Sequence, residues 1–220
     1  MATLTGLAPD PRQPGYRLVE VDRGRFASLP AAALEPLGLR LGAAIAPAAL
    51  ERLQNLADIE AAERAALRAL ARRAHARRDL QRRLGKKQHP PPAVEAALER
   101  LAARGLLDDR RFAEQYAALR AARGRGPWRL IQDLLAQGVE RRTAEDAVRR
   151  ALDEEGIDPA VEARAVAVKR ARQLGDLPDP IRKRRLLAFL VRRGYAGPQV
   201  KELVQELCGN AGAPARGQPP

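Results

Sequence analysis

The sequence predicts a mainly α-helical protein in which three tandem three-helix repeats follow a small N-terminal extension that contains a β-hairpin. Of the 220 residues, 44 are alanine and 31 are leucine, and both residue types favour helices. Aromatic residues, which favour strands, make up only 3% of the chain. Repeats of this kind stack on their neighbours, so an elongated, curved body is expected.

Two N-terminal parts are expected before the repeats. Residues 1–15 are rich in proline and glycine and lack a hydrophobic period, which predicts a flexible arm. Residues 16–58 are expected to form the small extension, which is nearly neutral in charge. Short helices are expected within it at residues 31–37 and from Pro47 onward, because glycine and proline bound these apolar segments.

A β-hairpin is predicted near the start of this extension. Residues 16–21 and 25–29 carry strand-forming patterns and are separated by the turn sequence Asp22, Arg23 and Gly24. A tight hairpin turn needs positive φ angles, which glycine adopts most readily. Gly24 is therefore expected to close the turn.

From residue 61 onward the pattern changes to short helices separated by glycine and proline. Breaks are expected near residues 75–77, 88–92, 105, 124–127, 138, 156–159, 175–180, 194–198 and 209. Five of them place a proline where a helix can begin, namely Pro92, Pro127, Pro159, Pro180 and Pro198. Proline is tolerated in the first turn of a helix, so these breaks predict nine helices.

The nine helices are related by an internal repeat. Two leucines spaced four apart, Leu80 and Leu84, recur about 50 residues later and again about 56 residues after that. The next helix keeps the register, with Val94 and Leu98 matched by Ala144 and Val148 and by Val200 and Val204. A three-helix unit used three times explains this spacing. The alternative is chance similarity among helices rich in alanine, leucine and arginine.

The repeat spacing sets the expected domain boundaries. The three repeats are expected at residues 59–107, 108–157 and 158–208. Residues 209–220 are rich in glycine, proline and alanine, and a disordered tail is expected there.

The composition excludes several functional classes. The chain has one cysteine (Cys208), two histidines (His75 and His89) and one serine (Ser28). A tetrahedral zinc site needs several Cys or His ligands at short spacings, and a catalytic nucleophile needs a neighbouring base. Neither set of residues is available, so no metal, no cofactor and no enzymatic activity are expected. His75 is interpreted as a helix-end or packing residue, and Cys208 as an inert residue near a frayed C-terminal helix.

Targeting signals are also missing from the sequence. The first residues contain no basic head followed by an apolar run, and the longest uncharged stretch, residues 41–50, is short and contains Pro47. This pattern predicts neither a signal peptide nor a membrane span. A cytoplasmic, monomeric protein is expected.

Two further features invite a functional interpretation. Asp108 and Asp109 are adjacent carboxylates that could hold a metal in a nuclease, but their place directly before a helix favours an N-cap and its dipole partner. Trp128 could stack on a nucleic-acid base, as could Tyr195, but its place at the start of a repeat helix favours core packing.

The net charge of +13 is unevenly distributed. Residues 61–107 hold 12 basic and 4 acidic residues, residues 108–157 hold 10 of each, and residues 158–220 hold 12 and 6. The excess therefore lies in the first and third repeats. The candidate binding residues are Arg72, Arg73, Arg77, Arg78, Arg82, Arg83, Lys86, Lys87, Arg182, Lys183, Arg184, Arg185, Arg192 and Arg193.

This charge predicts a polyanion as the binding partner. Four consecutive basic residues, 182–185, open a predicted helix, where the helix dipole disfavours cations. A nucleic acid would favour them instead. Phosphate contact rather than base stacking is expected, because aromatic residues are scarce. The alternative is that the arginines only cover solvated faces and extend over apolar surface. Arg192 and Arg193, taken alone, are better explained by the C-terminal end of a helix, where the dipole favours cations.

Several strings of the sequence form a family pattern. They are Leu-Leu-Asp-Asp-Arg-Arg-Phe-Ala at 106–113, Gly-Arg-Gly-Pro-Trp-Arg-Leu at 124–130 and the segment 134–139. This pattern resembles the central repeat of the RecX family of recombination regulators, and residues 70–80 and 184–195 resemble its first and third repeats. The resemblance covers roughly residues 60–207. Ala76 departs from it, since the family usually has a serine there, and the N-terminal extension is similar to one found in only some members.

The resemblance implies a non-enzymatic regulator that binds RecA, lies in the groove of the RecA–DNA filament, and mostly inhibits its ATPase and strand exchange. It also implies a place in DNA recombination, repair and the SOS response. Weak direct DNA binding is expected, and no membrane contact. The alternative function is a sequence-independent DNA-binding or architectural protein. The sequence leaves open which repeat contacts RecA and which contacts DNA.

Overall fold

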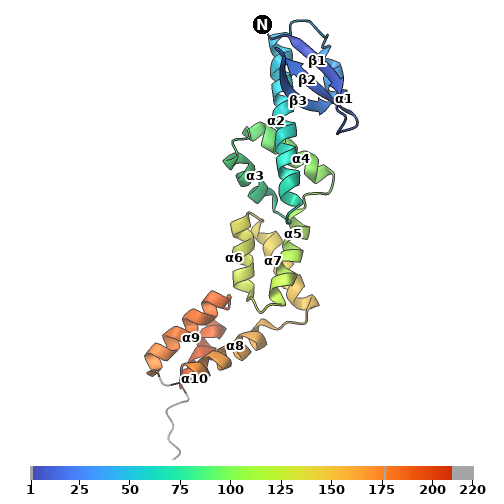
Figure 1. Cartoon of the computed structure of the whole chain (residues 1–220). Coiled ribbons are helices and arrows are strands. Elements are labelled where there is room, and N and C mark those ends of the chain that lie inside the picture. The colour runs from blue at the N-terminus through green and yellow to red at the C-terminus, as the bar shows by residue number, and fades with distance from the viewer. Residues whose placement is uncertain (1, 176, 210–220) are drawn as a thin grey trace, which may run out of the picture. The chain divides into compact units, whose positions relative to one another are not determined.

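The computed structural model describes residues 2–175 and 177–209 (Figure 1). Within them it contains ten α-helices, one short 3₁₀ helix and one three-stranded sheet. The chain divides into two compact units, Met1–Asp108 and Asp109–Pro220, and each is described by itself. The expected tail at residues 209–220 lies outside the described residues, apart from Gly209, which ends the last helix.

The first unit begins with an antiparallel sheet of β1 (Leu4–Pro9), β2 (Tyr16–Val21) and β3 (Gly24–Pro30), in that order. The expectation of a flexible arm for residues 1–15 is therefore wrong, since β1 pairs with β2 along its length and Leu4 is fully buried. Gly6 and Pro9 hide the strand pattern in the sequence. Both are tolerated because β1 is an edge strand with a register irregularity after Leu4.

The hairpin between β2 and β3 forms as predicted, but the turn is closed by different residues. Asp22 and Arg23 have positive φ angles of 50° and 63°, and Gly24 does not have one. The carboxylate of Asp22 accepts a hydrogen bond from the Thr3 backbone N–H at 2.8 Å, and the Arg23 N–H donates to the Thr5 hydroxyl at 2.9 Å. The first strand thus fixes this turn, which explains why two non-glycine residues hold the left-handed conformation.

A single helix joins the extension to the first repeat. The short α1 (Ala31–Leu34) and a 3₁₀ turn precede α2 (Pro47–Leu70), which runs without a break across the expected boundary between residues 58 and 59. Leu53, in the first half of α2, lies in the core under the sheet. Three alanines of its second half lie in the next core along with leucines from α3 (Arg77–Lys86) and α4 (Pro91–Ala103).

Buried carboxylates on α2 tie these elements together. Glu60 is only 3% exposed, and its carboxylate accepts hydrogen bonds from the Tyr16 hydroxyl at 3.2 Å and from Arg100 at 2.8 Å. Glu63, also buried, pairs with Arg100 and Arg104. Because Tyr16 begins β2 and both arginines belong to α4, these contacts link the sheet, α2 and the first repeat.

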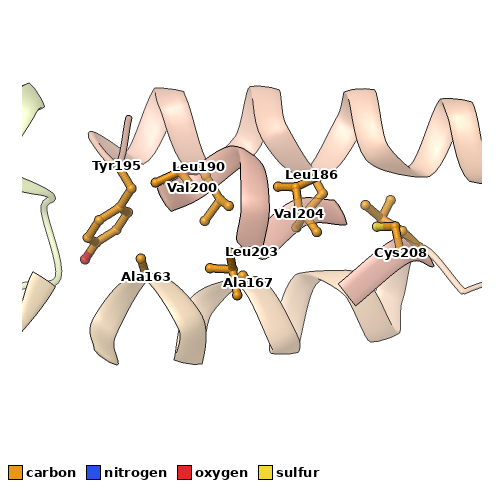
Figure 2. Close-up of a cluster of buried hydrophobic side chains, with 10 residues drawn as sticks. Ala163, Ala167, Leu186, Leu190, Tyr195, Val200, Leu203, Val204 and Cys208 are labelled. Atoms are coloured by element: carbon orange, nitrogen blue, oxygen red, sulfur yellow. The ribbon is translucent and has the colours of Figure 1, made fainter. Parts of the chain in front are cut away.

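The second unit contains two three-helix bundles. The first consists of α5 (Asp109–Ala121), α6 (Pro127–Gln137) and α7 (Arg141–Glu154), and the second of α8 (Pro159–Gln173), α9 (Asp179–Arg193) and α10 (Pro198–Gly209). Together with α2 to α4 these are the nine helices that the sequence predicts. Figure 2 shows the core of the last bundle, where Leu186 and Leu190 of α9 face Val200 and Val204 of α10.

The structure confirms the repeat at the level of single residues. The aligned leucines Leu80, Leu84, Leu130, Leu134, Leu186 and Leu190 are all at most 1% exposed. The middle helix of each repeat also ends in the same way, with a left-handed residue after its last turn. These residues are Gln88, Gly138 and Gly194, with φ angles of 63°, 93° and 97°. Chance similarity does not explain three left-handed residues at matching positions, each four residues after an aligned leucine.

The first repeat differs from the other two in holding glutamine at this left-handed position. A side chain there costs roughly 1–2 kcal/mol relative to glycine. Gln88→Gly is therefore expected to stabilise the first unit, by about 1 kcal/mol after allowance for the greater freedom of glycine in the unfolded chain. Urea unfolding followed by circular dichroism measures the change. A lower midpoint for Gln88→Gly would contradict the proposed strain.

Candidate nucleic-acid interface

The first basic surface lies on α3. Arg78, Arg82 and Lys86 recur every four residues and lie on the side of the helix away from the buried Leu80 and Leu84. All three are exposed, as are Arg72, Arg83 and Lys87 at the flanks. We call Arg78, Arg82 and Lys86 the α3 basic face.

Other predicted residues of this repeat are engaged within the protein. Arg77 is half-buried and forms ion pairs with Glu95 and with Glu99, the latter at 3.2 Å. Arg73 pairs with Asp79 at 3.2 Å. Arg77 and Arg73 therefore contribute to the fold, and their charge is largely compensated locally.

His75 is a packing residue, as predicted, since it is only 3% exposed. Its Nδ1 lies 2.6 Å from a carboxylate oxygen of Asp79. Partial burial raises the pKa of Asp79, but the hydrogen bond with His75 and the charges of His75, Arg73 and Arg82 outweigh burial and leave that pKa below its ordinary value. The pair links the N-terminus of α3 to the preceding loop, where Ala76 offers no side-chain cap.

The cluster at the start of α9 requires a correction. Arg182 is only 7% exposed, because it lies four residues before Leu186 on the buried side of the helix. Its guanidinium donates to the backbone carbonyl of Cys208 at 2.9 Å and pairs with Asp179 at 3.1 Å. Arg182 thus binds the C-terminal end of α10 and is not part of a binding surface.

The remaining members of that cluster differ in exposure. Lys183 is half-buried, whereas Arg184 and Arg185 are exposed. The electrostatic argument from the helix N-terminus therefore applies to fewer side chains than the sequence suggested.

A further basic site lies elsewhere in the second unit, where the α5–α6 loop meets the end of α9. A cavity of about 590 Å³ is lined by Arg120, Arg123, Gly124, Arg125, Arg129, Arg192 and Arg193. We call it the arginine cavity. Of these arginines, the sequence predicts only Arg192 and Arg193 as binding residues. The other four belong to the second repeat, whose charges sum to zero.

One carboxylate and two aromatic rings hold four of these arginines. Asp133 forms ion pairs with Arg125 and with Arg129, the latter at 3.0 Å, and accepts a hydrogen bond from the Tyr116 hydroxyl at 3.2 Å. The guanidinium of Arg120 lies 3.8 Å from the centre of the Tyr116 ring. Burial and the neighbouring Asp133 charge raise the pKa of Tyr116, so its hydroxyl stays protonated and can donate. The guanidinium of Arg193 lies over the ring of Phe189, at 5.5 Å from its centre.

A close approach of two glycines brings the two halves of the arginine cavity together. The Gly126 N–H donates to the carbonyl of Arg193 at 2.8 Å, and the Trp128 N–H donates to the carbonyl of Gly194 at 3.1 Å. A Cβ atom on Gly126 would lie 2.5 Å from the carbonyl of Gly194. The first N–H groups of α6 are thus satisfied by the last carbonyls of α9, which sets the positions of the arginines on both sides.

The aromatic, cysteine and aspartate residues that the sequence singles out lie at helix ends or in a core. Trp128 is 44% exposed, so the expectation that it packs in the core is wrong; the backbone of Gly194, not the indole, provides the contact at this helix start. Tyr195 and Cys208 are buried in the last core. Asp109 begins α5 and Asp108 directly precedes it.

The described residues contain no group of three or more His, Cys, Asp or Glu side chains that could hold a metal ion. None of their helices combines the length and hydropathy that crossing a bilayer requires.

Three family models match the three repeats in order. They describe the first, second and third three-helix domains of RecX and match residues 62–101, 108–148 and 162–204. The matches fall within the expected repeats.

Curated relatives named regulatory protein RecX match this chain over most of their own length. The regulatory protein RecX of Halorhodospira halophila is 41% identical over 142 residues, which is 64% of this chain and 85% of the relative. That of Mycobacterium leprae is 36% identical over 143 residues, or 63% and 80% of the two chains.

Solved structures share the fold. A crystal structure of regulatory protein RecX superposes with a TM-score of 0.71 at 19% identity and covers 94% of this chain and all of the other. RecX from Lactobacillus salivarius has a TM-score of 0.55 at 21% identity and covers 68% of this chain and 96% of its own. The family models, the relatives and the repeated helix ends together show that this chain belongs to the RecX family of regulatory proteins.

Proposed function

We propose that this chain regulates the RecA recombinase by binding RecA within the RecA–DNA filament, and that it mostly inhibits the ATPase and strand exchange of the filament. Membership of a family of regulatory proteins is the observation that carries the proposal. We propose that it acts in the cytoplasm, as a monomer and without chemistry of its own.

The distribution of charge supports contact with the filament rather than with RecA alone. Exposed basic side chains occur in both units, on the α3 basic face and at Arg184 and Arg185. Phosphates of the bound DNA are the groups that such side chains contact without reading bases. The three repeats supply several contacts on one chain, and linked contacts bind more tightly than each would alone.

The same basic surfaces also favour a second candidate, a protein that coats DNA without regard to sequence or to RecA. Co-sedimentation distinguishes the two functions. RecA filaments on oligothymidine and the same amount of bare oligothymidine are each mixed with the chain and pelleted on a common support. The proposed function predicts that more chain pellets with the filaments. Equal or smaller amounts with filaments would favour the coating protein.

A further inference from the structure

We propose that the arginine cavity is a binding site for the phosphodiester backbone of nucleic acid, with Asp133 as the positioning residue that orients its guanidinium groups. The inference rests on the proposed function for its setting, since it names the nucleic-acid contact of a filament regulator. Its physical argument depends only on the second unit.

The lining of the cavity suits phosphate groups. Six arginines line it, and one carboxylate, that of Asp133, pairs with two of them. Guanidinium stays charged at any physiological pH and donates through a planar fork that matches two phosphate oxygens. The cavity of about 590 Å³ leaves room for more than one phosphate group.

Four of the six arginines are held in place before any ligand arrives. Arg125 and Arg129 share Asp133, Arg120 stacks on Tyr116, and Arg193 lies over Phe189. Side chains that are already ordered lose less entropy on binding. This order distinguishes the cavity from a surface on which arginines are merely exposed.

The other two arginines are available to a ligand. Across residues 2–175 and 177–209, the guanidinium groups of Arg123 and Arg192 form no ion pair and no ring contact, and both side chains are exposed. One comes from the second repeat and the other from the third. A phosphate chain bound between them would therefore contact both bundles at once.

The negative charge of Asp133 does not prevent an anion from binding in the arginine cavity. Its side chain is only 15% exposed, and Arg125, Arg129 and Tyr116 all donate to it. These partners compensate the negative charge of Asp133 within the protein. The six arginines therefore leave the cavity with a large excess of positive charge. Asp133 instead orients the arginines, because its carboxylate holds the guanidinium groups of both Arg125, in the α5–α6 loop, and Arg129, in α6.

The lining favours a polynucleotide backbone over a free nucleotide. Among the described residues, only arginines and Gly124 line the cavity, so its lining includes no aromatic side chain on which a base could stack. A backbone brings several phosphates in a row and leaves its bases outside, which fits contact without sequence preference.

The test uses the full chain, fluorescein-labelled oligothymidine and fluorescence anisotropy at several salt concentrations. In Arg123→Gln with Arg192→Gln, two phosphate contacts are lost. The slope of log affinity against log salt is expected to become shallower by about 1.4, and affinity near physiological salt to fall about tenfold.

The matched control is Arg142→Gln with Arg172→Gln, which removes the same charge from exposed positions outside the cavity lining. Less than a twofold change is expected for it, because ordinary surface charges act weakly through salt. Equal losses in the two double variants would overturn the site, since the effect would then be one of net charge.

Asp133→Asn distinguishes binding by oriented arginines from binding that depends on net positive charge alone. The change removes one negative charge, so the net positive charge rises by one. A cavity that acts only through charge would then bind oligothymidine more tightly. An ordered site is expected to bind it severalfold more weakly. Binding as tight as or tighter than that of the unchanged chain would contradict the positioning role. Should this variant fail to fold by circular dichroism, the arginine pair still decides the proposal.

Competition identifies the source of the phosphate. At constant ionic strength, ATP and inorganic phosphate are expected to displace oligothymidine only at concentrations far above that of unlabelled oligothymidine. Displacement by ATP at equal concentration would replace the polynucleotide by a nucleotide and overturn the proposal. Because RecA is absent from these experiments, a negative result would overturn the cavity as a binding site without contradicting the proposed regulation of RecA. That function is tested by co-sedimentation and by the ATPase of RecA.

Discussion

Gly194→Ala is expected to lower the free energy of unfolding of the second unit by about 3 kcal/mol. A left-handed backbone, with φ of 97°, costs an alanine roughly 1–2 kcal/mol. The added Cβ would also lie 2.7 Å from the carbonyl oxygen of Gly126 and 2.8 Å from the backbone nitrogen of Arg129. Forcing the two segments apart adds an overpacking cost of roughly 1–3 kcal/mol.

Gly156→Ala is the matched control for this prediction. Gly156 also has a positive φ, of 62°, but a Cβ there would have no neighbour within 4 Å. Its replacement isolates the backbone cost, expected at about 1 kcal/mol. Urea unfolding followed by circular dichroism measures both variants. Equal losses would mean that the Gly126–Gly194 contact does not hold the two bundles together.

Phe112→Ala is expected to cost about 3 to 5 kcal/mol, the range for removing a large buried aromatic side chain. Phe112 is only 7% exposed, and the centres of its ring and the Tyr116 ring are 5.9 Å apart. Its loss therefore removes core contacts and the support of the ring on which Arg120 stacks.

Leu119→Ala on the same helix provides the control, because Leu119 is 53% exposed. A change within about 0.5 kcal/mol is expected for it, as for most surface positions. Thermal or urea unfolding resolves the two effects. If Phe112→Ala were as mild as Leu119→Ala, α5 would not be anchored as described. Reduced function in an unfolded Phe112→Ala variant would say nothing about contacts with a partner.

The repeats could be predicted from the sequence because their signal is periodic and buried. Leucines at equivalent positions, such as Leu80 and Leu130, fill the same place in each core, and glycine or proline stands at most of the breaks between helices. Both signals arise from local chemistry that a single chain displays along its length. The fold class and the order of the helices follow from them.

The candidate site was harder to predict because it depends on contacts between distant segments. Arg182 looks like its exposed neighbours in sequence, yet helical spacing from Leu186 places it in the core. Arg123 and Arg125 belong to a repeat with no net charge, and only the approach of Gly194 to Gly126 brings them to Arg193. Summing charges by repeat conceals such a cluster. The first strand was missed for a similar reason, since its pairing partner defines it.

The most direct test of the account measures the DNA-dependent ATPase of RecA while the chain is added. A regulator bound within the filament is predicted to lower the ATPase at amounts well below those that would cover the DNA. Oligothymidine binding by the chain alone, measured in the same buffer, fixes the amount needed for coverage. Inhibition that begins only when the DNA is covered, or no change in ATPase at all, would contradict the proposed regulation of RecA.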